Sequence, residues 1–249
     1  MQFRRSLPGA GSTDFYLTDP EKGGLSEEQQ RYVADLVMEY RRKYPKLTIN
    51  AVWDFGMEEG DPVQSEKFGV FEDSRDNAVY NAKMLTVSIN HARVRKMACK
   101  ADPEEIREIE RYYSRYADLS SRFAARQAEL LARGTPWPQI EGIIRQEMDI
   151  VPCAENLLSA SDQYFADVQA IRMLENTQSN QRLLIHEIGH MLSEESGLES
   201  SKKLKKLFGR CRDGFEDLHE FCAECFMAAE LTDRVGLANE YRDLLREIL

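Results

Sequence analysis

Long apolar runs are missing from this sequence of 249 residues. A membrane-spanning helix needs about 18 or more consecutive apolar residues, and no stretch approaches that length. The first residues also lack the apolar segment of a secretory signal peptide. We therefore expect a soluble protein without a membrane partner that is cytoplasmic, or exported without a conventional signal peptide.

Positive charge is also in short supply. The chain has 33 Lys and Arg residues against 43 Asp and Glu residues, which gives a formal net charge of −10. Because binding to phosphates requires a basic face, a nucleic acid is not an expected partner. Basic residues do gather within 202–212. We expect a solvated helix face there, with a rim that attracts acidic substrates as the alternative.

Cysteine and histidine are scarce. The five cysteines are an odd number, widely spread, in a chain large enough to fold without disulfide bonds, which favours reduced thiols. These cysteines are Cys99, Cys153, Cys211, Cys222 and Cys225. There are only four histidines, and two of them lie in one short motif.

That motif is H-E-x-x-H, formed by His186, Glu187 and His190 within the stretch NQRLLIHEIGHML that starts at Asn180. The stretch is apolar nearly all round, which predicts a buried helix. Residues four apart in a helix lie almost above one another, so both imidazoles point to one place with Glu187 beside them. Burying these groups is costly without a partner. The partner that this spacing predicts is one zinc ion per chain, and Glu187 is the predicted catalytic residue.

A glycine interrupts the same helix. Glycine in a helix interior costs about 1 kcal/mol relative to alanine. We therefore expect another backbone, or the metal site itself, to approach closely at Gly189.

A catalytic zinc ion commonly has three protein ligands and one open position, so the chain must offer a third ligand. A histidine six residues after His190 is excluded, because Ser196 stands there. Glu220 is the best candidate, since it lies in a largely apolar predicted helix with Glu224 one turn later. Carboxylates in such a helix are costly unless they are paired or bound to metal. We predict Glu220 as the ligand and Glu224 as the acceptor for an imidazole N–H.

Two other interpretations of this region are open. The acidic residues at positions 213, 216, 220 and 224 follow helical spacing and could form an exposed acidic stripe. A structural zinc cluster is the second possibility, although a Cys-x-x-Cys inside a helical pattern is more typical of small core residues. Its ligands would be Cys211, His219, Cys222 and Cys225.

The motif, followed some thirty residues later by EFCAECF from Glu220 to Phe226, resembles the gluzincin metallopeptidases. It is most similar to the catalytic domain of the anthrax lethal factor type, whose glutamate helix reads E-F-x-A-E-x-F. Less closely, that helix resembles the small metallopeptidases that cleave phage repressors. The resemblance covers mainly residues 80–95 and 180–249. It includes the expected strand ending at Asn90, which is similar to the strand that flanks the substrate in the lethal factor group.

This resemblance implies that His186, His190 and Glu220 bind zinc, that Glu187 is the catalytic base, and that Glu224 supports an imidazole. The lethal factor type also has a catalytic tyrosine just before the glutamate helix, but residues 191–219 contain no Tyr. The group that stabilises the oxyanion is therefore open. The candidates, in falling order of preference, are His219, Tyr80, His91 and Arg212.

These residues predict a zinc metalloendopeptidase acting on a protein or peptide substrate. A zinc-bound water, activated by Glu187, would attack the peptide carbonyl. We expect the substrate to pair with the exposed edge of a strand at 85–90. One alternative is a catalytically weak or inactive zincin-fold binding or scaffold protein, associated with a phage or a toxin. Another is amide hydrolysis on a non-peptide substrate, although no cysteine motif upstream supplies a sulfur ligand. The oligomeric state is open.

The predicted fold is α+β and zincin-like, mostly helical with a small β-sheet before the H-E-x-x-H helix. Residues 1–25 read as an irregular arm, and 26–249 as one catalytic domain with a helical insert at about 102–175. Strands are expected at 47–53 and, half-buried, at 85–90, with a short extended piece at 69–71. Besides the motif helix, helices are expected at 26–43, 102–134, 135–148, from 161 or 162 to about 174, 200–209, 215–231 and 237–249.

Overall fold

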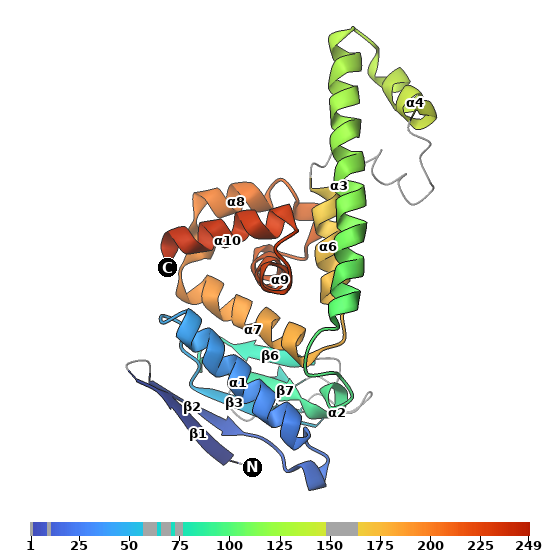
Figure 1. The fold of residues 1–249 in the computed structure, drawn as a ribbon. Helices are drawn as coiled ribbons and strands as arrows, with labels where there is room; N and C mark the ends of the chain where they lie inside the picture. The colour runs from blue at the N-terminus through green and yellow to red at the C-terminus, as the bar shows by residue number, and fades with distance from the viewer. Residues whose placement is uncertain (1, 9–10, 57–63, 66–70, 73–76, 148–163) are drawn as a thin grey trace.

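The structure is a computed structural model, and it describes residues 2–8, 11–56, 64–65, 71–72, 77–147 and 164–249 (Figure 1). The fold is α+β and mostly helical, with a small mixed sheet of five strands in the order β1-β2-β3-β7-β6. Strands β2, β3 and β7 run parallel, whereas β1 and β6 are antiparallel to their neighbours. The strands are β1 (Gln2–Leu7), β2 (Gly11–Tyr16), β3 (Ala51–Phe55), β6 (Ala78–Asn81) and β7 (Thr86–Asn90), beside a separate pair, β4 (Gln64–Ser65) and β5 (Phe71–Glu72).

The interpretation of residues 1–25 as an irregular arm is wrong. Strands β1 and β2 form an antiparallel hairpin at one edge of the sheet. Thr13 and Phe15 of β2 point into the core, while Asp14 and Tyr16 are only half-buried. The alternation that specifies this strand is short and lies among Gly, Ser and Asp residues, which also favour loops.

Strand β7 occupies the interior of the sheet, between β3 and β6, and all five of its residues are buried. The expectations of a half-buried strand and of an exposed edge at 85–90 are therefore wrong. Alternation in one segment cannot reveal which strands will flank it. The outer strand on this side is β6, which contacts the motif helix. Similarly, the strand expected at 47–53 begins only at Ala51.

Most of the predicted helices are present. The capping box of Ser26 and Gln29 opens the first helix, and Asp102 caps the long third one. The start of a helix at 161 or 162 lies outside the described residues, which resume at Tyr164. The helices are α1 (Glu27–Lys43), α2 (His91–Val94), α3 (Pro103–Ala132), α4 (Trp137–Glu147), α6 (Phe165–Glu175), α7 (Asn180–Glu195), α8 (Lys202–Phe208), α9 (Leu218–Leu231) and α10 (Gly236–Ile248), with 3-10 turns η1 (Pro20–Lys22), η3 (Leu198–Ser200) and η4 (Arg212–Gly214).

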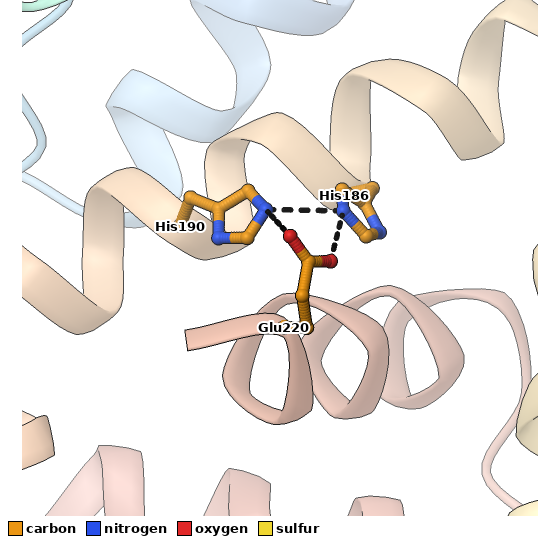
Figure 2. A group of neighbouring side chains, drawn as sticks. All are labelled: His186, His190 and Glu220. Atoms are coloured by element: carbon orange, nitrogen blue, oxygen red, sulfur yellow. Dashed lines mark hydrogen bonds and ion pairs between the residues drawn. The ribbon is translucent and has the colours of Figure 1, made fainter. Parts of the chain in front are cut away.

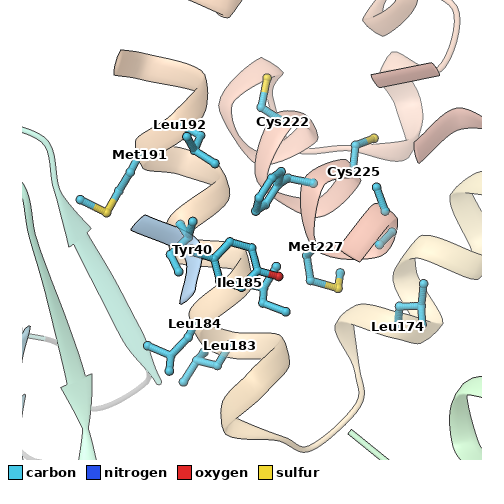
Figure 3. Packing of buried hydrophobic residues seen from close by; sticks show 14 of the residues in the cluster. Tyr40, Leu174, Leu183, Leu184, Ile185, Met191, Leu192, Cys222, Cys225 and Met227 are labelled. Carbon is cyan, nitrogen blue, oxygen red and sulfur yellow. The ribbon is translucent and has the colours of Figure 1, made fainter. Parts of the chain in front are cut away.

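The core is built around α7. Leu184 and Ile188 of α7 share one buried cluster with Val37 of α1 and with Val87 and Ile89 of β7. On its other side α7 packs against α9, where apolar side chains of both helices interleave (Figure 3). Since burial of apolar area is the main stabilising term in folding, packing on both sides holds α7 firmly in the core.

The predicted helical insert divides into two parts. The far half of α3 projects from the body, and α4 packs on it through a small separate cluster (Figure 1). That cluster centres on Leu130, Ile140 and Ile144. By contrast, α6 belongs to the main core, where Ile171 and Leu174 are fully buried. No helix in the described part of the chain is long and apolar enough to cross a membrane.

Candidate metal centre

Gly189 allows α7 and α9 to touch. A Cβ at this position would lie 2.9 Å from the Cα of Ala223 and 3.1 Å from its carbonyl oxygen. The prediction that another backbone approaches Gly189 is confirmed. Asp217 caps α9 by accepting a hydrogen bond from the Glu220 N–H at 2.9 Å, so Glu220 lies in the first turn of α9, facing α7.

Three of the predicted ligands meet at this crossing. His186 and His190 extend from consecutive turns of α7, and Glu220 reaches them from α9 (Figure 2). The two Nε2 atoms are 3.1 Å apart. Glu220 Oε2 lies 3.3 Å from His186 Nε2, and Glu220 Oε1 lies 3.5 Å from His190 Nε2. In the described part of the chain, these three residues are the His, Cys, Asp or Glu side chains that lie close enough together, in a group of three or more, to hold a metal ion.

These separations fit a single metal ion. Nitrogen and oxygen ligands of a tetrahedral ion lie about 2.1 Å from it, which places them about 3.4 Å from each other. His186 Nε2 lies close to that distance from His190 Nε2, at 3.1 Å, and from Glu220 Oε2, at 3.3 Å, while the 3.5 Å contact of His190 Nε2 is with the other carboxylate oxygen, Oε1. With one ligand atom from each side chain, the three atoms lie within 4.8 Å of one another. An ion can therefore bind between the three side chains without a large rearrangement of either helix.

Charge is distributed unequally over the two histidines. Burial disfavours the charged form of His186, but hydrogen bonds to Glu175 and Glu220 outweigh it and raise the pKa of His186 to about 10. Burial and the nearby charge of His186 both lower the pKa of His190. The hydrogen bond with His186 lowers the pKa of Glu220. Without a metal, the site therefore holds one imidazolium, one neutral imidazole and one carboxylate at neutral pH.

Glu187 lies beside this group and is only 7% exposed. Burial, together with the negative charges of Glu220 and Glu175, raises its pKa to about 7. The charge of His186 and a hydrogen bond from the backbone N–H of Tyr80 on β6 lower the pKa of Glu187 and so offset part of this rise. A carboxyl group with a pKa near 7 can accept and return a proton at neutral pH.

A carboxylate that the sequence analysis missed supports His186. Glu175, the last residue of α6, places its Oε2 3.2 Å from His186 Nδ1. We predicted Glu224 for this role, and Glu224 does not fill it, since no described hydrogen bond joins it to an imidazole. Burial and the charge of Glu175 raise the pKa of Glu224 to about 7. Glu175 stands eleven residues before His186, outside the motif and the helix that carries it.

His219 is the predicted oxyanion donor that lies against the site. Its ring stacks on that of His190, with ring centroids 4.1 Å apart and an angle of 28° between the planes. Its Nδ1 lies 2.7 Å from Glu199 Oε1, so Nε2 is the nitrogen left for a substrate.

The other predicted donors lie elsewhere. The hydroxyl of Tyr80 is buried, and its pKa is raised by burial and by the charges of Glu194 and Glu195 at the far end of α7. His91 pairs with Asp54, 3.4 Å away. Arg212 lies on the exposed surface of η4. Only the backbone N–H of Tyr80 reaches the site.

The alternative cluster of cysteines is not formed. Cys211, Cys222 and Cys225 are buried in the hydrophobic core, and His219 is hydrogen-bonded to Glu199 instead. The described cysteines, these three and Cys99, form no disulfide bond, which agrees with the predicted reduced thiols. Cys153 lies outside the described residues.

Comparisons of this chain with protein-family models, with curated proteins and with solved structures gave no match. Its function must therefore be inferred from the site. The structure brings together His186, His190 and Glu220, with Glu187 beside them.

Proposed function

We propose that this protein is a zinc-dependent metallopeptidase of the gluzincin type, with a zincin-like fold. The observation that carries the proposal is the meeting of His186, His190 and Glu220, whose ligand atoms, one from each side chain, lie within 4.8 Å of one another, next to the buried carboxyl of Glu187. Two imidazoles and one carboxylate are a donor set found in catalytic zinc sites, where a fourth position is kept open. The order of the elements, a small sheet followed by the motif helix and then the glutamate helix, supports the same class.

When bound, zinc supplies Lewis acidity: it polarises a carbonyl oxygen and lowers the pKa of water to about 7. Glu187 takes the proton from the attacking water and delivers it to the leaving amine, for which its pKa of about 7 is suited. His219 is held by Glu199 at 2.7 Å, and when both of its ring nitrogens are protonated its Nε2–H donates to the oxygen on which negative charge develops.

The substrate is expected to bind along β6. This strand is the outer one of the sheet, it contacts α7, and the backbone N–H of Tyr80 reaches Glu187. Backbone groups on the free side of an edge strand can pair with an extended peptide. An extended peptide on β6 would lie next to α7, on the strand whose Tyr80 N–H reaches Glu187, which favours a protein or peptide substrate.

Metal binding should release a proton and strengthen as the pH rises. The metal-free His186 has a pKa of about 10, so near pH 7 it must lose a proton before it can bind an ion. We expect the affinity for Zn²⁺ to rise about tenfold per pH unit between pH 6 and 8, with about one proton released per ion. Calorimetric titration in buffers of different ionisation enthalpy measures both. An affinity that is independent of pH would contradict the protonated state of His186.

The proposed function is tested by incubating the protein with a peptide library in the presence of Zn²⁺, and again with a chelator. Cleavage that the chelator abolishes and Zn²⁺ restores is the expected result. Metal binding without cleavage of any peptide would instead favour a zincin-like binding or scaffold protein.

A further inference from the structure

The connection between α6 and α7 is held by a buried arginine. The side chain of Arg182 is only 6% exposed. Its Nε donates to the carbonyl oxygen of Thr177 at 3.2 Å, and its Nη1 donates to Glu175 Oε1 at 2.7 Å. The N-cap Ser179 accepts from the Arg182 N–H at 3.1 Å. A guanidinium fixed at both ends in this way leaves the Glu175 carboxylate little freedom to rotate.

The second oxygen of that carboxylate faces a metal ligand. Glu175 Oε2 lies 3.2 Å from His186 Nδ1, on the opposite side of the imidazole from Nε2. A carboxylate only accepts hydrogen bonds, so Nδ1 must carry a proton. In the neutral ring the lone pair is then on Nε2, which faces His190 and Glu220. The rotation of the ring and the position of its proton are thus both suited to binding an ion.

We propose that Glu175 is the positioning residue of the metal centre: it orients the imidazole of His186, and Arg182 in turn orients Glu175. Glu175 belongs to α6, whereas the residue predicted for this role, Glu224, belongs to α9. The proposal rests on the metal site of the proposed function, not on peptidase activity. Hydrogen bonds of this kind typically contribute 10- to 100-fold to metal affinity. Among the described residues His190 has no carboxylate in the same position, since its buried Nδ1 has no hydrogen-bond partner there. Its ring is stacked on that of His219 instead, so Glu175 acts on His186 alone.

The test compares Glu175→Ala with Glu175→Gln and with the matched control Glu224→Gln. Glu224 is a half-buried carboxylate of the same neighbourhood, on α9, without a hydrogen bond to an imidazole among those described. Two quantities are measured: Zn²⁺ affinity by competition with a chromophoric chelator, and the ¹H–¹⁵N signal of His186 Nδ1–H by NMR in the metal-free protein. Thermal unfolding of each variant monitors the fold.

We expect Glu175→Ala to lose 10- to 100-fold in Zn²⁺ affinity and to lose the slowly exchanging Nδ1–H signal. Glu175→Gln, whose amide oxygen can still accept from Nδ1, should recover part of the affinity and the signal, and it also serves if the alanine variant fails to fold. Glu224→Gln should change neither by more than about twofold.

Two results would overturn the proposal: an unchanged affinity and signal in Glu175→Ala, or the larger loss in Glu224→Gln. Failure of the metal site in the proposed function gives a different result: the parent protein itself then binds no Zn²⁺. The His186 Nδ1–H signal of the metal-free protein still shows in that case whether Glu175 holds the ring.

Discussion

Replacing Glu187 by glutamine should lower kcat/KM for peptide cleavage by about a thousandfold and leave the metal content unchanged. Glutamine keeps the size of the side chain but cannot accept the proton of the attacking water. Glu187 is not among the three converging ligands, so zinc should still bind. The measurement is the rate of cleavage of one identified peptide, with metal content determined on the same samples.

Two controls make this result specific. Glu194→Gln changes an exposed carboxylate two turns later on the same helix and should retain near-parental activity. Stability should not fall in Glu187→Gln, because burial raises the Glu187 pKa to about 7 and the charged carboxylate is therefore disfavoured in the fold above that pH. If Glu187→Gln cleaved as fast as the parent, Glu187 would not be the base.

Replacing Gly189 by valine should destabilise the protein by about 3 kcal/mol and weaken metal binding. The added Cβ would lie 2.9 Å from the Cα of Ala223, and backbone cannot move aside as a flexible side chain can. Helices α7 and α9 would have to separate, which also moves Glu220 away from the histidines. Urea unfolding of the metal-free protein measures the loss.

The matched control is Gly142→Ala. Gly142 lies inside α4, and a Cβ there would meet no atom within 4 Å. Alanine should therefore stabilise that helix by up to about 1 kcal/mol. Equal, small effects of Gly142→Ala and Gly189→Val on the urea midpoint would show that the close contact of α7 with α9 is not required.

Patterns that depend on neighbours along the chain were predictable. The i, i+4 spacing of His186 and His190 placed both rings on one side of a helix, and the capping box at Ser26 marked the start of α1. The close contact at Gly189 followed from the cost of glycine in a helix. The choice of Glu220 as the third ligand rested on the cost of a carboxylate in an apolar helix, and the structure brings Glu220 next to His186 and His190.

Features that depend on pairing between distant segments were not predictable. The place of β7 inside the sheet is set by β3 and β6, and alternation within 85–90 carries no information about either neighbour. Glu175 supports His186 only because α6 ends beside α7. The spacing of the two residues in the sequence does not indicate that they will be neighbours. Glu224 was preferred because a carboxylate in an apolar helix needs a partner and because of the family resemblance, and neither says how far its side chain is from a ring.

The central claim is that His186, His190 and Glu220 form one zinc site. Elemental analysis of the purified protein beside its Glu220→Ala variant tests it most directly. We expect about one zinc per chain in the parent and a marked loss in the variant. A variant that retains its zinc would place the third ligand elsewhere, and a parent protein without zinc would contradict the metal centre itself.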